Sequence, residues 1–145
     1  MTGITSDADE VLLLRHIPGG TLYQGKPPLR ITSENFKLRV NPGTGETETG
    51  ISVRISTVGT LLTDANALLT RHGAKPDSRI GWAYRHAVEA AGFSVQHDPT
   101  PDDLTHYLIQ SGTSRLEDHA GRKRLAAVFN WVDALGSEPR GPASR

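Results

Sequence analysis

The sequence predicts an α/β domain, with α+β as the alternative, in which three helices pack on one small mixed sheet of four to five strands. Three observations support this prediction. Several short runs of aliphatic and β-branched residues have the pattern of strands, three later segments have apolar residues at helical spacing, and the 145-residue length fits one domain. We therefore expect a single globular domain over residues 9–135, between flexible tails at residues 1–8 and 136–145.

Composition limits the classes of function open to the chain. Sixteen Lys and Arg residues balance sixteen Asp and Glu residues, so no overall charge attracts nucleic acid or an anionic membrane. The absence of cysteine excludes disulfides, thiolate metal sites and cysteine nucleophiles. The acidic start of the chain and the shortness of its apolar runs predict neither a signal peptide nor a membrane span. We expect a soluble cytoplasmic protein that has no membrane partner.

The first predicted element is the strand Val11–Ile17, with the sequence VLLLRHI. Its consecutive aliphatic residues need cover on both faces, which predicts a central position in the sheet. A Pro-Gly-Gly turn at residues 18–20 ends it. Because side chains alternate along a strand, Arg15 and His16 should point to opposite faces.

Residues 21–50 are rich in turn formers and contain one strand-like segment. In residues 35–40, Lys37 and Arg39 alternate with three apolar residues, which predicts a half-exposed or edge strand. Those three apolar residues are Phe36, Leu38 and Val40. Residues 50–56 alternate more strongly and predict another strand. Its apolar side holds Ile51, Val53 and Ile55, and its polar side holds Ser52, Arg54 and Ser56.

Helical spacing begins after this strand. A stripe of Leu61, Ala65, Leu68 and Leu69 predicts a helix that Thr60 caps and that residues 73–76 end. A second helix is predicted over residues 79–91 and a third over residues 122–135. Between them, residues 93–95 and 105–109 predict two short strands that pair as a hairpin.

The candidate catalytic residues are Arg15, His16, Ser52 and His106. In a small enzyme, a hydrolase for example, with its pocket at the end of strand 11–17, Arg15 would bind an anion and Ser52 would position the substrate. His16 or His106 would act as the acid or base. The structural alternative is an arginine that pairs with an acid and a histidine that bonds to a turn.

An Arg or His on an early strand and a Ser on a second strand resemble two parts of the ADP-ribosyltransferase scheme. Arg15 or His16 with Ser52 would supply them. The scheme also has a catalytic Glu late in a small split sheet. No acid stands on residues 105–109, and Glu117 falls at a predicted helix start. The resemblance implies an NAD-consuming enzyme and covers two short strands.

Metal and cofactor motifs are absent from the sequence. His97, Asp98 and His106 could meet across a hairpin, but the chain has no HxxxH, HExxH or HxH spacing. It also has no Walker or dinucleotide-binding fingerprint. We predict no metal and no cofactor.

A basic run on the third predicted helix could contact phosphates. It consists of Arg122, Lys123 and Arg124. Nearby acidic residues dilute its charge, and a solvated helix face is the better interpretation. Nucleic acid is therefore the least favoured partner.

The favoured hypothesis is an interaction or accessory module that binds another protein or a second copy of itself. The strand predicted at residues 35–40 offers an edge to which a partner strand could be added. Phe36, Leu38 and Val40 are its candidate contact residues.

Overall fold

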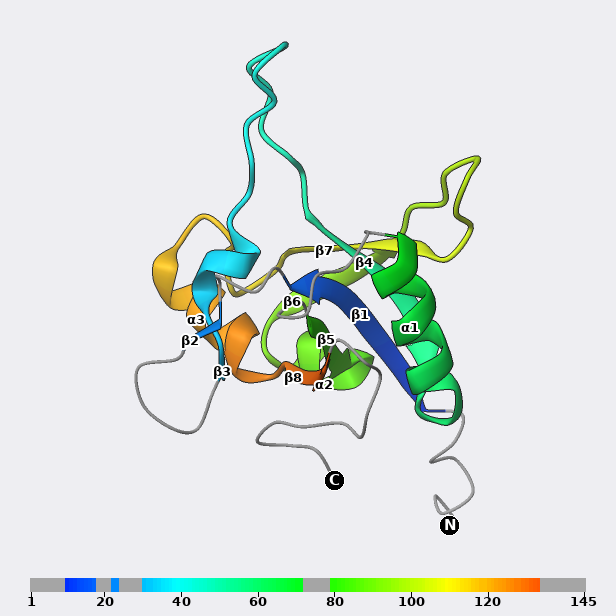
Figure 1. Ribbon diagram of the computed structural model, residues 1–145. Helices are drawn as coiled ribbons and strands as arrows, with labels where there is room; N and C mark the ends of the chain where they lie inside the picture. The colour runs from blue at the N-terminus through cyan, green and yellow to red at the C-terminus, as the bar shows by residue number, and fades with distance from the viewer. Residues whose placement is uncertain (1–9, 18–21, 24–29, 72–78, 134–145) are drawn as a thin grey trace.

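The computed structural model describes residues 10–17, 22–23, 30–71 and 79–133. The predicted tails, the turn at residues 18–20 and the helix stop at residues 73–76 lie outside these residues. The class is mixed α+β, with one six-stranded antiparallel sheet and three helices (Figure 1). The observed class agrees with the α+β alternative of the prediction. The predicted mixed sheet is wrong, because every pair of neighbouring strands is antiparallel, and the sheet has more strands than the four to five expected. No helix of the described residues is long and apolar enough to cross a membrane.

The strands of the sheet run in the order β6-β7-β4-β1-β5-β8, and each neighbouring pair is antiparallel. They are β1 (Val11–Ile17), β4 (Ile51–Thr57), β5 (Arg79–Tyr84), β6 (Phe93–His97), β7 (His106–Ser111) and β8 (Asn130–Asp133). The first strand has the predicted bounds and lies inside the sheet, between β4 and β5. A separate ribbon joins β2 (Leu22–Tyr23) to β3 (Arg30–Ile31).

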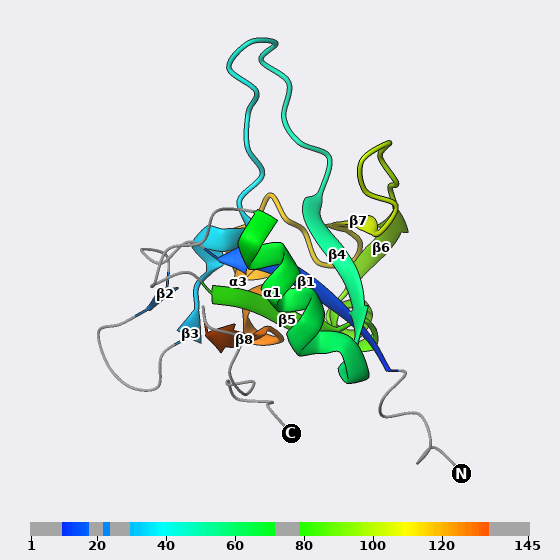
Figure 2. The same cartoon turned by 45° about the vertical axis from the view of Figure 1, so that its right-hand side comes forward.

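The alternation of aliphatic residues along β1 builds a core on each face of the sheet. Leu12 and Leu14 pack with α1 (Leu61–Arg71), which lies in front of the sheet in Figure 2. Leu13 and Ile17 belong to a larger core on the opposite face. That core is covered by α2 (Arg85–Ala90), α3 (His119–Ala127) and a 3-10 helix at Ser33–Phe36.

The helix predicted after residue 60 and the hairpin predicted over residues 93–109 are both present. Helix α1 buries Leu61, Ala65, Leu68 and Leu69 as predicted. Thr60 and Ser56 donate their hydroxyls to Oδ2 of Asp64 at 2.9 and 2.5 Å, which ties the residues before the helix to its first turn. The predicted hairpin is present as β6 and β7.

The helix predicted over residues 79–91 is wrong in its first half. Residues 79–84 form β5, and the helix begins only at Arg85. Ile80 and Trp82 face α1 while Ala83 belongs to the larger core, so both faces of the strand are buried. A buried strand has apolar residues on both sides, which a helical pattern can mimic.

The helix predicted over residues 122–135 is also corrected. It begins at His119 and ends at Ala127, after which residues 130–133 form β8. Phe129 and Trp131 enter the larger core with the alternation of a strand. A Cβ atom at Gly121 would overlap the carbonyl O of Arg115, so glycine lets the helix start approach the preceding loop.

The strand predicted at residues 35–40 is not formed. Phe36 ends the 3-10 helix, and residues 37–50 then leave the domain and return as a long projecting hairpin, which we call the arm (Figures 1 and 2). A single bridge pairs Val40 with Thr47. The arm joins β4 at Ile51.

Candidate functional site

Arg15 is half-buried on the side of β1 that faces the larger core. It donates from Nε to the carbonyl O of Asn35 at 3.0 Å and from Nη1 to the carbonyl O of Ser52 at 2.8 Å. Its guanidinium carbon lies 6.0 Å from the centre of the Phe36 ring. Burial, with a smaller contribution from the charge of Arg39, lowers the pKa of Arg15 to about 10. The guanidinium is therefore still a cation at neutral pH, and it ties the 3-10 helix and β4 to β1.

The other candidate catalytic residues belong to the α1 face. Alternation places His16 on the side of Leu14, which packs under α1. Arg54 lies opposite both Leu14 and His106 in the strand register, so these side chains share one face. Ser52, two residues from Arg54, follows on that face. The structure thus places His16, Ser52 and His106 on one side of the sheet and Arg15 on the other.

An ion cluster stands on the same face. The Nε of Arg54 donates to Oδ2 of Asp103, and Nη1 of Arg71 lies 3.7 Å from that oxygen. Oδ1 of Asp103 accepts from the backbone N and the hydroxyl of Thr105, at 2.9 and 2.5 Å. The cluster joins β4, the end of α1 and the loop between β6 and β7.

Burial and charge differ among these side chains. Asp103 exposes 8% of its side chain, Arg54 exposes 23% and Arg71 exposes 49%. Burial by itself raises the pKa of the Asp103 carboxyl. The hydrogen bonds from Thr105 and Arg54 outweigh burial, so the pKa of Asp103 lies below its ordinary value. Asp103 is therefore ionised at neutral pH.

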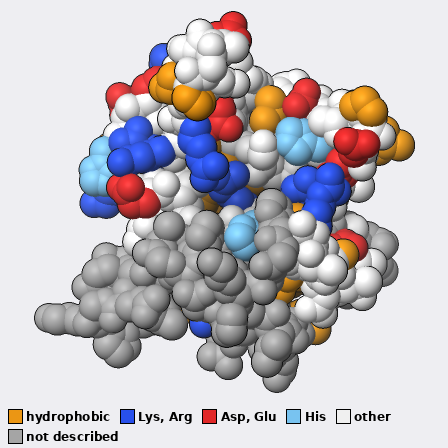
Figure 3. Space-filling view, turned by 45° about the horizontal axis from the view of Figure 1, so that its top comes forward, with side chains coloured by type: hydrophobic (Ala, Val, Ile, Leu, Met, Phe, Trp, Pro, Cys, Tyr) orange, Lys and Arg blue, Asp and Glu red, His pale blue; other side chains and the backbone are white. Residues whose placement is uncertain are grey.

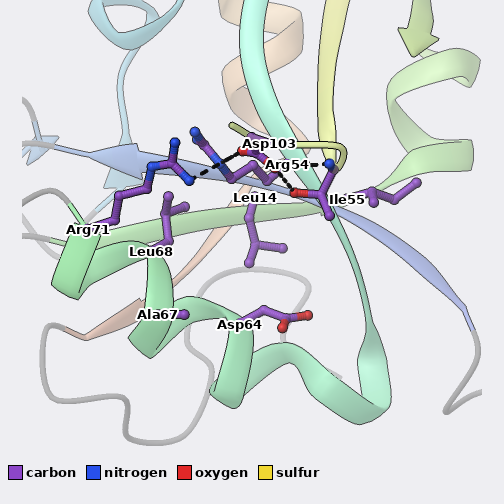
Figure 4. A pocket seen from close by; sticks show the side chains of 9 residues that line it. Leu14, Arg54, Ile55, Asp64, Ala67, Leu68, Arg71 and Asp103 are labelled. Atoms are coloured by element: carbon purple, nitrogen blue, oxygen red, sulfur yellow. Dashed lines mark hydrogen bonds and ion pairs between the residues drawn. The ribbon is translucent and has the colours of Figure 1, made fainter. Parts of the chain in front are cut away.

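A cavity of about 230 Å³ opens beside the cluster (Figure 4). Its apolar wall comes from β1 and α1, and its polar lining includes the three members of the cluster. These lining residues are Leu14, Ala67, Leu68, Arg54, Arg71 and Asp103. The cavity combines fixed cations with an apolar surface, a combination suited to a small amphipathic anion.

This cluster could not be predicted from the sequence alone. The alternation in residues 50–56 placed Arg54 on the polar face of its strand, but it named no partner. Asp103 lies 49 residues further along the chain, in the loop after β6. The register of β4 and β7 brings the two together, and neither segment alone reveals that register.

The two histidines of the hairpin face opposite sides. His106 Nδ1 lies 2.8 Å from the carbonyl O of Asp98 and 3.2 Å from its Oδ2. His97 Nε2 instead lies 2.9 Å from the carbonyl O of Leu104, and its ring stacks on Tyr107 with centroids 4.6 Å apart. Only Asp98 and His106 meet. Among the described residues, no three His, Asp or Glu side chains are placed to hold a metal ion.

The basic run on α3 does not form one surface. Lys123 and Arg124 are exposed, but Arg122 turns back and donates from Nη1 to the carbonyl O of Leu116 at 2.8 Å. A second cavity, of about 440 Å³, lies beside Lys123 between α3 and the 3-10 helix. On the face seen in Figure 3, basic side chains alternate with acidic ones.

The three residues that were expected to contact a partner along an edge strand lie in different environments. Phe36 is fully buried, and its ring centroid lies 5.0 Å from that of Phe129. Leu38 is half-buried against the larger core. Val40 is 59% exposed on the arm. Of the three, Val40 is the one that a partner can reach freely.

Two backbone hydrogen bonds flank the single bridge of the arm, which pairs Val40 with Thr47. The backbone N of Glu48 donates to the carbonyl O of Arg39 at 2.8 Å, and the N of Asn41 donates to the carbonyl O of Glu46 at 2.7 Å. The pair of Val40 and Thr47 between them is a non-hydrogen-bonded pair. The backbone N–H and C=O groups of these two residues therefore point away from the hairpin.

No protein-family model, curated protein or solved structure matches the chain significantly.

Proposed function

We propose that the protein is an interaction module that acts by binding another protein, and that the arm is its contact element. One observation carries this proposal. Every residue from 39 to 49 is exposed, yet the hairpin is ordered by its own hydrogen bonds. Long ordered excursions of this kind are usually functional, because fixing the backbone costs entropy that burial normally offsets.

The tip of the arm is organised in advance of any contact. Oδ1 of Asn41 accepts from the backbone N of Gly43 and Thr44 at 2.7 and 3.3 Å. The N of Gly45 donates to the carbonyl O of Asn41 at 2.7 Å, and its φ of 75° is one that glycine adopts without strain. A partner would therefore meet a largely preformed hairpin, which lowers the entropy cost of binding.

The chemistry around Val40 suits an extended protein segment. An exposed apolar side chain stands beside outward backbone donors and acceptors, which is the arrangement that strand addition uses. The arm carries Lys37 and Arg39 against Glu46 and Glu48, so its formal charge is balanced. A phosphate backbone would need a surplus of cations.

Site-specific photo-crosslinking tests the proposal in cells of the source organism. The crosslinking residue replaces Val40, and a matched control replaces Leu62, which is 37% exposed on α1. We expect the Val40 variant to give one defined protein adduct that the Leu62 variant lacks. An adduct at twice the 15.7 kDa chain mass would identify the partner as a second copy. No adduct at Val40, or the same adducts from both positions, would contradict the proposal.

A further inference from the structure

We propose that the cavity beside Arg54 and Arg71 binds a small organic molecule through an oxyanion group, either phosphate or carboxylate. This site lies on the α1 face of the sheet and is independent of the arm. Its cations come from β4 and from the end of α1, and its apolar wall comes from β1 and α1 (Figure 4).

The two arginines keep donors available for a ligand. Arg54 contacts Asp103 through Nε, and in the described part of the chain its two Nη nitrogens have no protein acceptor. Arg71 approaches the same carboxylate only through Nη1. Asp103 holds both guanidinium groups in place, and most of their donors have no acceptor among the residues that the structure describes. The planar fork of a guanidinium matches the oxygen spacing of phosphate and carboxylate groups.

The arginine end of the cavity has an excess of positive charge. Two guanidinium groups share the single Asp103 carboxylate there. Asp64 also lines the cavity, but its Oδ2 accepts hydrogen bonds from Ser56 and Thr60. Figure 4 shows its side chain apart from the two guanidinium groups. The two arginines therefore keep a net positive charge that would attract an anion.

The apolar wall and the size of the cavity limit the ligand class. Leu14, Ala67 and Leu68 offer contact to a hydrocarbon or ring, which a free inorganic ion would leave unused. A volume of about 230 Å³ accommodates a small molecule. Nucleic acid would instead need an open basic surface.

Titration of the whole protein with matched probes tests the site, with chemical shifts of backbone amides as the readout. Phenyl phosphate and benzoate carry the two oxyanions on the same ring, phenol is the neutral control, and inorganic phosphate lacks the ring. We expect at least one ring oxyanion to shift the amide signals of residues around Arg54. These shifts should saturate with a dissociation constant of about 1 mM or lower. The stronger of the two identifies the ligand's anionic group. Phenol and inorganic phosphate should bind at least about tenfold more weakly.

A pair of variants separates binding from folding. Arg71→Gln should weaken the ring oxyanion at least about tenfold, because it removes a charged donor. Arg115→Gln is the matched control, since Arg115 is also exposed and pairs with Glu117 at 3.2 Å. Both variants should keep the wild-type melting temperature, and Arg115→Gln should bind as the wild type does. Three results would overturn the proposal: no saturation by either oxyanion, equal binding of phenol, or unchanged binding in Arg71→Gln.

Discussion

Arg54 and Asp103 lie 49 residues apart in the chain and form an ion pair that fastens the loop between β6 and β7 to the middle of β4. The other oxygen of the same carboxylate holds Thr105, whose carbonyl O accepts from the backbone N of Ile55 at 3.0 Å. One side chain thus fixes the entrance of β7 and orients the arginines of the cavity.

Removal of this carboxylate should destabilise the fold. Asp103→Ala should lower the free energy of unfolding by about 2–3 kcal/mol, because it leaves Arg54 partly buried without its partner. Urea unfolding measures the change. Asp102→Ala, an exposed neighbour in the same loop, should stay within about 0.5 kcal/mol of the wild type. Equal effects of the two substitutions would show that the ion pair does not stabilise the loop.

The stabilisation by Asp103 should disappear in acid. Its folded pKa lies below its unfolded pKa, so on acidification the unfolded state takes up the proton first. The contribution is complete above the unfolded pKa and is lost as the pH falls through the folded pKa. The difference in unfolding free energy between the wild type and Asp103→Asn should therefore shrink below about pH 4. Urea titrations at several pH values measure it, and a difference that grows in acid would refute the assignment.

Substitution of Arg15 should destabilise the fold. Arg15→Ala leaves the carbonyl groups of Asn35 and Ser52 without their guanidinium donor, and we expect a loss of about 2 kcal/mol or more in unfolding free energy. Arg39→Ala, at an exposed position on the arm, is the control and should change the unfolding free energy little. A fully stable Arg15→Ala protein would instead leave Arg15 free for a role in binding.

Phe36 and Val40 should respond to truncation very differently. Phe36→Ala should cost about 3–5 kcal/mol of unfolding free energy, because it opens a cavity against Phe129. Val40→Ala should change it by less than about 0.5 kcal/mol, because Val40 is exposed. Thermal unfolding of both variants checks the contrast, which similar losses would disprove.

The parts of the fold that depend on short-range pattern could be predicted from the sequence. Four successive aliphatic residues in β1 predict a strand that is buried on both faces. The apolar residues that begin at Leu61 recur with the period of a helix. The errors arose where tertiary pairing decided the outcome. Trp82 and Trp131 sit in strands because β5 pairs with β1 and β8 pairs with β5, not because their local sequence avoids helix.

The candidate site was less accessible to sequence reasoning. The alternation separated Arg15 from His16 correctly, since that separation depends only on the period of a strand. The Arg54 cluster required the register of β4 and β7, which the sequence does not display. The arm was visible as turn-forming residues around Asn41, but its projection away from the core follows from how its two ends join the sheet and the 3-10 helix.

The proposed function is tested most directly with a variant whose arm is shortened. The measurement is the affinity of this variant for the partner protein that is cross-linked through Val40. In this variant an Asn-Gly turn replaces residues 40–47 and closes the hairpin at the pair of Arg39 and Glu48. Calorimetry with the purified partner should show an affinity at least about tenfold weaker than that of the wild type. The melting temperature should be unchanged, because the deleted residues are exposed. Unchanged affinity in a folded variant would contradict the assignment of the arm as the contact element.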